Sequence, residues 1–377
     1  MRTPLAEEFG IEYPVFAFTP SKAVAAAVTR AGGMGVLGCV RYNDADELDA
    51  VLTWMDENTD GKPYGVDIVM PNKVPTEGSP EDIAAMIPEE HKAFVSRVLD
   101  DLGVPPLGDD AEHNAGVLGW LHSVAEAHVE MSLKHRPVLI ANALGSPPKH
   151  IIDLAHANGM KVAALAGAKK HALAHVDNGV DIVIAQGGEA GGHTGEVATL
   201  VLVPEIVAAL DGRAPVLAAG GLGDGSQVAA VIGMGAEGAW MGSRWLTAAE
   251  YGDDGGSKAM QEALVAATSA DTVRTRIYSG KPARLLKSKW TEAWTAEDAP
   301  SPLPMPLQNL LVAEAHQRIS QSQDPEVVAM PAGQIIGSLE GVVPVAETMA
   351  QIVAEYEVAV ERLRGTLGCP TPPRSAR

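Results

Sequence analysis

The chain has 377 residues, of which 46% are hydrophobic and only 4% aromatic, and its formal net charge is -20. A charge of this size opposes polyanions, so nucleic acids and anionic membrane surfaces are excluded as expected partners. Because Lys and Arg together number only 28, any phosphate site must depend mainly on backbone N–H groups and helix N-termini.

The two cysteines, Cys39 and Cys369, are too few to staple a chain of this length. The start of the chain lacks the apolar core of a signal peptide, and no uninterrupted apolar stretch reaches the ~18 residues of a membrane span. The sequence therefore predicts a cytoplasmic enzyme or binding protein without disulfides.

Short apolar runs alternate with Ala-rich stretches over residues 1–250. This is the pattern of repeated β-α units and a parallel sheet. Eight strands fit a closed (β/α)8 barrel of the TIM type, and an open doubly wound sheet is the alternative. The strands are expected at 13–18, 34–40, 64–70, 137–142, 160–165, 180–185, 214–219 and 236–241, and helices at 21–31, 45–58, 149–158, 168–178, 200–210 and 225–234.

Two segments interrupt the alternation. Residues 71–120 form a long insertion after the third strand, with one helix expected near 88–102. A loop at this end of a barrel strand either shapes substrate access or is a tolerated surface insertion. Residues 251–377 are expected to form a helical cap on the substrate side, with a Pro-rich turn at 300–306 leading into helices at 307–322 and 331–364.

Two stretches match the dinucleotide-binding pattern G-x-G-x-x-G, at 33–38 and 233–238. That fingerprint needs a strand before it and a helix after it. In both stretches the expected order is reversed. The glycines are therefore interpreted as helix-to-strand turns.

The most informative segment is the glycine-rich loop at 186–195, directly after the sixth strand. Glycines at this density are costly to order, and they are typical of places where backbone approaches a ligand. Loops after barrel strands carry the chemistry of such folds. His193 is the one residue of the loop that exchanges protons near neutral pH, so it is the candidate catalytic residue.

Two further glycine-rich loops follow the seventh and eighth strands, at 218–225 and 241–244. Barrels often bind phosphate at these two loops. Glycines, free N–H groups and a helix N-terminus can form such a site without lysines. We therefore predict a phosphate-binding site there.

No metal site is predicted. His171 and His175 share one face of a helix, but that helix is expected on the outer ring and a third ligand is not evident.

The stretches at 23–38, 185–195, 215–225 and 235–246 resemble, in the same order, the nitronate monooxygenase family, formerly called 2-nitropropane dioxygenases. FMN-dependent enoyl-ACP reductases and NADH:quinone reductases are related to that family. Further matching stretches lie at 280–290, 304–311 and 332–339.

The resemblance implies a bound FMN, with His193 facing the flavin ring as the acid–base residue. The Pro-rich turn at 300–306 and the Gly333–Gln334 turn are predicted to close over the substrate side of the flavin. The residues implied to hold the flavin or its ribityl phosphate are Asn72, Gln186, Gly191, Gly220, Gly221, Met241, Gly242 and Ser243.

One departure concerns the end of the first strand, where the family usually has Ala-Pro-Met and this chain has Ala17-Phe18-Thr19-Pro20. The substrate side of the pocket is therefore expected to differ.

The expected function is FMN-dependent oxidation of alkyl nitronates by O2. The alternatives are NAD(P)H-dependent reduction of an enoyl thioester or quinone, a flavin-free lyase or synthase using Lys73 or Glu189, and a binding protein without turnover. A small-molecule substrate is expected for each of the enzyme alternatives. A homodimer is possible.

Overall fold

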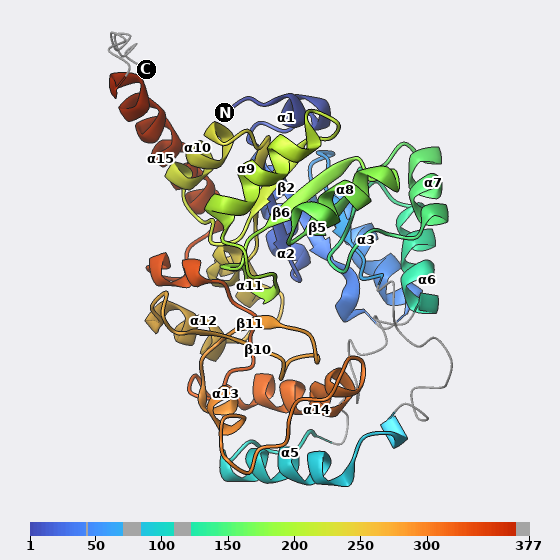
Figure 1. Ribbon diagram of the computed structural model, residues 1–377, viewed down its shortest axis with the longest axis vertical. Helices are drawn as coiled ribbons and strands as arrows, with labels where there is room; N and C mark the ends of the chain where they lie inside the picture. The colour runs from blue at the N-terminus through green and yellow to red at the C-terminus, as the bar shows by residue number, and fades with distance from the viewer. Residues whose placement is uncertain (43, 71–83, 109–121, 367–377) are drawn as a thin grey trace.

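The computed structural model describes residues 1–42, 44–70, 84–108 and 122–366. Eight parallel strands close into a barrel in the order β1-β2-β3-β4-β5-β6-β8-β9, with helices around it (Figure 1). The predicted (β/α)8 barrel is confirmed, and the open sheet is excluded. The strands are β1 (Val15–Thr19), β2 (Met34–Gly38), β3 (Gly65–Asp67), β4 (Leu139–Asn142), β5 (Lys161–Ala166), β6 (Ile182–Gln186), β8 (Val216–Ala219) and β9 (Gly238–Met241).

Alternate residues of the strands fill the barrel interior, among them Phe16, Val36 and Trp240. The short helix α1 (Pro4–Phe9) places Leu5 in the same core. The backbone N–H of Leu5 donates to the Glu237 carboxylate, 2.8 Å away. Because α1 closes the N-terminal end, the other end, where the strands terminate, is the face on which a site can form.

Helices that follow the strands form the outer ring. Their starts agree with capping chemistry: Ser21, Asp44 and Asp224 each accept a hydrogen bond from a backbone N–H of the first turn. All six helices expected in this ring are present. The ring contains α2 (Lys22–Arg30), α3 (Ala45–Asn58), α6 (His122–Ser132), α7 (Lys149–Ala157), α8 (Lys169–Asp177), α9 (Thr199–Leu210) and α10 (Gly225–Gly233).

The C-terminal helix α15 (Val345–Thr366) packs against α10 and α2, and so takes the eighth place in the ring. Figure 1 shows its far end projecting beyond the body of the molecule. The expected helix at 331–364 is wrong in its first part. Proline and glycine are frequent between Pro331 and Pro344, and they disfavour a helix there.

The contact between α10 and α15 is close at Gly225. A Cβ built there would lie 1.9 Å from the backbone oxygen of Ile352 and 2.3 Å from the Tyr356 nitrogen. The N–H of Gly225 also donates to the Glu355 carboxylate, at 2.9 Å. The absence of a side chain at this position therefore allows the last helix to dock.

We expect Gly225→Ala to lower the free energy of unfolding by about 2 kcal/mol, a typical cost of overpacking. Gly233→Ala in the same helix is the matched control, because a Cβ there meets nothing within 4 Å. The control should be neutral or slightly stabilising, by roughly 0.5–1 kcal/mol. Urea unfolding of both variants checks this, and equal stability of the two would contradict the close docking of α15.

Between β9 and α15 the chain leaves the ring. This part contributes β10 and β11 to a three-stranded antiparallel sheet in the order β10-β11-β7, whose third strand comes from the loop after β6. The sequence did not predict this sheet. The strands are short and lack a long alternating pattern. The elements are β7 (Gly192–His193), β10 (Thr272–Thr275) and β11 (Ala283–Leu286), with η3 (Ser243–Thr247), α11 (Ala249–Asp253), α12 (Lys258–Ala266), α13 (Lys289–Ala293), α14 (Leu307–Ser322) and η4 (Gln334–Ser338).

The helix expected in the insertion is present as α5 (Glu89–Asp101), and it packs on α14 at the end of the molecule remote from α1 (Figure 1). Phe94 and Val98 share one hydrophobic core with Trp290 and Val312. The described helix of the insertion is therefore built into the C-terminal region and is more than a surface addition.

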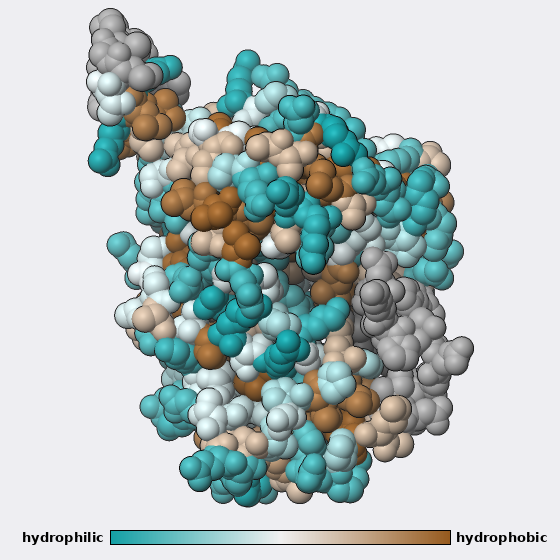
Figure 2. All heavy atoms as spheres, in the orientation of Figure 1, coloured by the Kyte–Doolittle hydropathy of each residue, from teal (hydrophilic) through white to brown (hydrophobic). Residues whose placement is uncertain are grey.

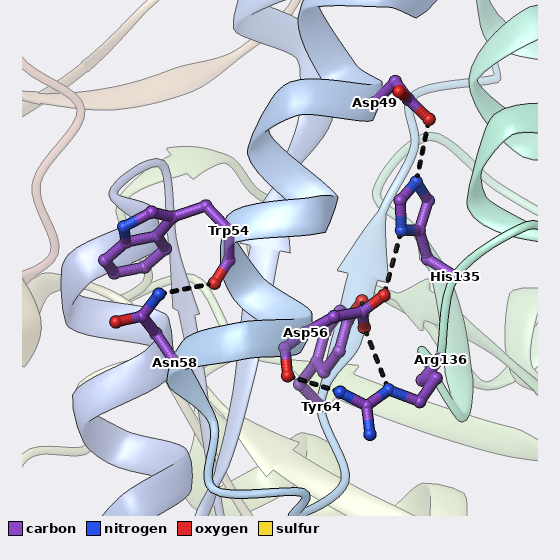
Figure 3. A network of polar contacts seen from close by, with 7 residues as sticks. All are labelled: Asp49, Trp54, Asp56, Asn58, Tyr64, His135 and Arg136. Atoms are coloured by element: carbon purple, nitrogen blue, oxygen red, sulfur yellow. Dashed lines mark hydrogen bonds and ion pairs between the residues drawn. The ribbon is translucent and has the colours of Figure 1, made fainter.

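A polar network ties α3 to the chain that enters β4 (Figure 3). His135 lies between two carboxylates, with Nδ1 3.0 Å from Asp56 Oδ2 and Nε2 3.1 Å from Asp49 Oδ1. The hydroxyl of Tyr64 donates to the other oxygen of Asp56, at 2.8 Å. This network contributes to the stability of the barrel and lies away from the strand ends that form the mouth.

Polar side chains cover most of the face seen in Figure 2, and an apolar patch lies over the region of α9. Leu200 and Val201, at the start of that helix, are 72% and 59% exposed. None of the helices in the described residues is long and apolar enough to cross a membrane.

Candidate active site

The glycine-rich loop after β6 carries His193 at the mouth of the barrel. Residues Gly192 and His193 form β7, which pairs with β11 at Arg284 and Ala283. The N–H of Thr194 donates to the backbone oxygen of Pro282, at 3.3 Å. The catalytic candidate is thus held between the barrel and the hairpin formed by β10 and β11.

The imidazole of His193 lies 2.6 Å, through Nε2, from the hydroxyl of Ser279. Ser279 is fully buried, and its oxygen also accepts the N–H of Lys281 at 3.4 Å. Burial, and to a smaller extent the Lys281 ammonium, lower the pKa of His193 to about 4. His193 is therefore neutral at pH 7 and able to accept a proton.

Aromatic side chains pack beside His193. The ring of Tyr278 meets His193 edge to face, with centroids 6.3 Å apart, and stacks on His316 at 5.2 Å. Burial raises the pKa of Tyr278 and lowers that of His316 to about 4. Both side chains are therefore neutral at pH 7, so His193 sits beside an uncharged wall.

Glu189, a further titratable residue of the loop, has a structural partner. Its carboxylate accepts the N–H of Thr199 at 2.9 Å and the Thr199 hydroxyl at 3.0 Å. Thr199 is the first residue of α9, where a negative charge stabilises the helix. Glu189 therefore fixes the loop to α9 and is a poor candidate for proton transfer.

The two phosphate-loop candidates converge on this histidine loop. Gly220 and Gly221 have φ of 102° and 69°, a conformation that L side chains rarely adopt. A Cβ on Gly221 would lie 3.1 Å from Glu189 Cβ, and one on Gly191 would lie 2.7 Å from the nitrogen of Gly333. These close approaches explain the glycines.

The loop after β9 joins the same cluster through Ser243, whose hydroxyl accepts the N–H of Gly333 at 2.8 Å. The next N–H, of Gln334, donates to the backbone oxygen of Glu189 at 2.9 Å. The turn at residues 333–334 therefore contacts both the histidine loop and the loop after β9. The Pro-rich turn approaches too, since a Cβ on Gly280 would meet the Leu303 oxygen at 2.4 Å.

The donor set suits a phosphate monoester. Within the described residues, the backbone N–H groups of Gly221 and Leu222 donate no hydrogen bond inside the protein. A Cβ on Gly242 would have Phe18 Cδ1 as its nearest neighbour, at 3.8 Å, so open space adjoins this glycine. Gly220 and Gly221 also border a cavity of 440 Å³ beside α9 and α10, whose lining does not include Gly242 or Ser243. The residues present therefore fit the phosphate end of FMN.

The other predicted flavin contacts differ in orientation. Gln186 ends β6 opposite Ala219, whose side chain lies in the barrel interior, so Gln186 faces the mouth. Met241 ends β9, but its side chain packs in the core between strands and helices, so only its backbone can contact a ligand. Asn72 lies outside the described residues.

Phe18, where the sequence departs from the family pattern, lies in the barrel mouth. Its ring stacks on Trp240 with centroids 6.4 Å apart, and a Cβ on Gly38 would meet it at 3.1 Å. A large aromatic ring therefore occupies the end of the first strand.

Sequence reasoning missed several site residues. Asp67 ends β3 beside Ala141 of the interior core, and burial raises its pKa to about 7. Ser279, Tyr278 and Arg284 come from the unpredicted hairpin. Their one signal was the matching stretch at 280–290, which named no partner for His193.

The expected histidine pair on α8 is no metal site, since His175 uses both ring nitrogens, on Ser146 Oγ at 2.7 Å and the Leu165 oxygen at 3.0 Å. Searched over the described ranges, the chain brings together no group of three metal-ligating side chains.

A closed β/α barrel with a neutral, half-buried histidine among glycine-rich loops defines an enzyme site. The family model described as nitronate monooxygenase matches residues 2–355. The chain belongs to this family, and it is an oxidoreductase.

Among curated proteins, one of Mycobacterium tuberculosis named "Putative monooxygenase Rv1533" is 42% identical, over 97% of this chain and 99% of its own length. A "Probable nitronate monooxygenase" of Staphylococcus aureus is 28% identical, over 88% and 90%.

Two solved structures are similar over nearly their full lengths. The nitroalkane oxidase of Streptomyces ansochromogenes superimposes with a TM-score of 0.77 at 26% identity, covering 95% of this chain and 99% of that one. FabK of Thermotoga maritima gives a TM-score of 0.72 at 26% identity, covering 97% and 99%.

Proposed function

We propose that the protein is an FMN-dependent nitronate monooxygenase that oxidises alkyl nitronates with O2, with His193 as the acid–base residue. The observation that carries this proposal is the position of His193, neutral and hydrogen-bonded to Ser279 beside three converging glycine-rich loops. Membership of the family and the likeness to a nitroalkane oxidase support the substrate class.

The loops after β8 and β9 would hold the ribityl phosphate, through Gly220, Gly221, Gly242 and Ser243. Gln186 would reach the flavin with its side chain, whereas Gly191 and Met241 would use their backbone. Asn72 stays a proposal from the family resemblance alone. The bound flavin supplies the electron-accepting group that the protein's own side chains lack.

His193 would remove the α-proton of a nitroalkane and so generate the nitronate, or would return a proton to the product. The hydroxyl of Ser279 would hold the ring in place by accepting a hydrogen bond from Nε2–H, which leaves the basic lone pair of the neutral ring on Nδ1, where the substrate proton would be taken up. The aromatic wall of Tyr278 and His316 excludes water from this side of the histidine, which favours proton transfer to substrate rather than to solvent.

A second function is favoured by the likeness to FabK, at a TM-score of 0.72. In this reading NAD(P)H would reduce the flavin, and His193 would protonate an enoyl thioester or a quinone after hydride transfer. A flavin-free lyase is less well supported, because Glu189 is engaged at the start of α9 and Lys73 lies outside the described residues.

The substrate test uses the purified flavin-loaded protein. We expect O2 uptake with alkyl nitronates, at a rate that added NADH or NADPH does not change. Anaerobic mixing with either nicotinamide should leave the flavin absorbance intact. Rapid anaerobic bleaching by NADH, with no nitronate-dependent O2 uptake, would replace the monooxygenase proposal with the reductase.

A further inference from the structure

Two arginines stand opposite each other on the hairpin that covers the histidine loop. Arg274 of β10 and Arg284 of β11 are direct cross-strand partners. Like charges in this position destabilise a sheet, and here burial and, after it, the charge of Arg274 lower the pKa of Arg284. Hydrogen bonds from the two guanidinium groups must therefore offset the repulsion between them.

Arg284 makes its contacts with the backbone that leads into the histidine loop. Its Nε and Nη2 both donate to the backbone oxygen of Gly188, at 3.0 and 2.8 Å. Its Nη1 donates to the hydroxyl of Thr272 on β10, at 3.0 Å. The planar guanidinium thus holds one carbonyl with two donors while a third donor fixes it to the hairpin.

Arg274 contacts the other side of the same loop. Its Nη2 donates to the backbone oxygen of Thr194, at 3.3 Å, and its Nη1 pairs with Glu196 at 3.2 Å. Gly188 precedes His193 in the chain, and Thr194 follows it. The two guanidinium groups therefore hydrogen-bond to the loop backbone on both sides of the histidine.

The loop is otherwise held on the hairpin side by the His193–Ser279 contact, by the N–H of Thr194 on the Pro282 oxygen and by the pairing of β7 with β11. It is rich in glycine, and a glycine backbone has the largest conformational freedom to lose. The β7–β11 pairing is limited to Ala283 with His193 and Arg284 with Gly192. The same residue, Arg284, therefore joins the loop through its backbone and its side chain.

We propose that Arg284, opposed by Arg274, is a positioning residue that sets the distance between His193 and Ser279. In this role Arg284 touches neither substrate nor cofactor. Its expected effect on turnover rests on the proposed function of His193. Its effect on the environment of His193 is independent of which reaction the enzyme performs.

The test is Arg284→Met, which keeps an unbranched apolar stem and removes the three donor groups that Arg284 uses. We expect kcat to fall about 10²-fold, the size of loss that a displacement of about 1 Å of a reacting group produces. The pKa of His193, followed by NMR titration, should rise from about 4 toward its ordinary value as the loop loosens and admits water.

Arg213→Met is the matched control, because Arg213 pairs with Asp177 on the outer ring at 2.5 Å. It should leave both measurements unchanged. Arg284→Lys keeps the charge with a single donor group, and it serves as the test if Arg284→Met does not fold. For Arg284→Lys we expect a smaller fall in kcat and a smaller rise in the pKa of His193 than for Arg284→Met.

A folded Arg284→Met or Arg284→Lys protein with the wild-type kcat and the wild-type His193 titration would overturn the proposal. A shifted titration with unchanged turnover would keep the positioning role and would instead contradict the assignment of His193 as the acid–base residue. The two failures are therefore distinguishable.

Discussion

Replacement of His193 by Asn is expected to lower turnover of a neutral nitroalkane, whose α-proton must be removed, by about 10²–10⁴-fold, the usual contribution of general acid–base catalysis. Asparagine has a similar size and can still hydrogen-bond to Ser279, but it cannot exchange a proton near neutral pH. The flavin content should stay near that of the wild type, because the phosphate loops do not use this side chain. Steady-state kinetics and the absorbance spectrum measure both quantities.

The pH dependence provides the control. Below its pKa a histidine is protonated and cannot act as a base. Because the pKa of His193 is lowered to about 4, turnover that needs the neutral ring should persist from pH 7 down toward pH 5 and fall only on further acidification. His193→Asn should lack this acid limb. Full activity in that variant would remove His193 from the chemistry.

The second large effect is expected at the phosphate loops. Gly242→Asp should fold but purify without flavin, because the new carboxylate would occupy the open space beside the proposed phosphate and repel it. A Cβ at this position meets no atom nearer than Phe18 Cδ1, at 3.8 Å, so the substitution itself is tolerated sterically. The flavin-to-protein ratio is read from the visible absorbance.

Gly233→Asp adds the same charge at an exposed glycine of α10, where a Cβ meets nothing within 4 Å. It should purify yellow, with about one FMN per chain. If Gly242→Asp kept the same flavin ratio as this control, the phosphate site would have to lie elsewhere.

The barrel itself could be predicted from the sequence because each β-α unit is local. The apolar run that becomes β6 and the helix that becomes α10 are specified by their own residues and by caps such as Asp224. The position of His193 followed from the same reasoning, since a loop after a barrel strand lies at the mouth wherever the helices pack.

The partners of His193 could not be predicted, because they are set by contacts between distant segments. Ser279 lies far along the chain in a hairpin whose strands are four residues each. The pairing of β11 with β7 depends on the whole excursion between β9 and α15. The first part of the helix expected at 331–364 was predicted wrongly for a local reason, because prolines and glycines at 331–344 disfavour a helix.

The shared core of α5 and α14 has a consequence for biosynthesis. Phe94 and Val98 are made early, but Trp290 and Val312, which cover them, leave the ribosome only after all eight barrel strands. The outer ring of helices is also incomplete until α15 has been synthesised and has packed against α10 and α2. Contacts so distant in sequence slow folding and leave apolar surface open to aggregation. We therefore expect yield in expression to depend on chaperone supply more than the stability of the finished fold would suggest.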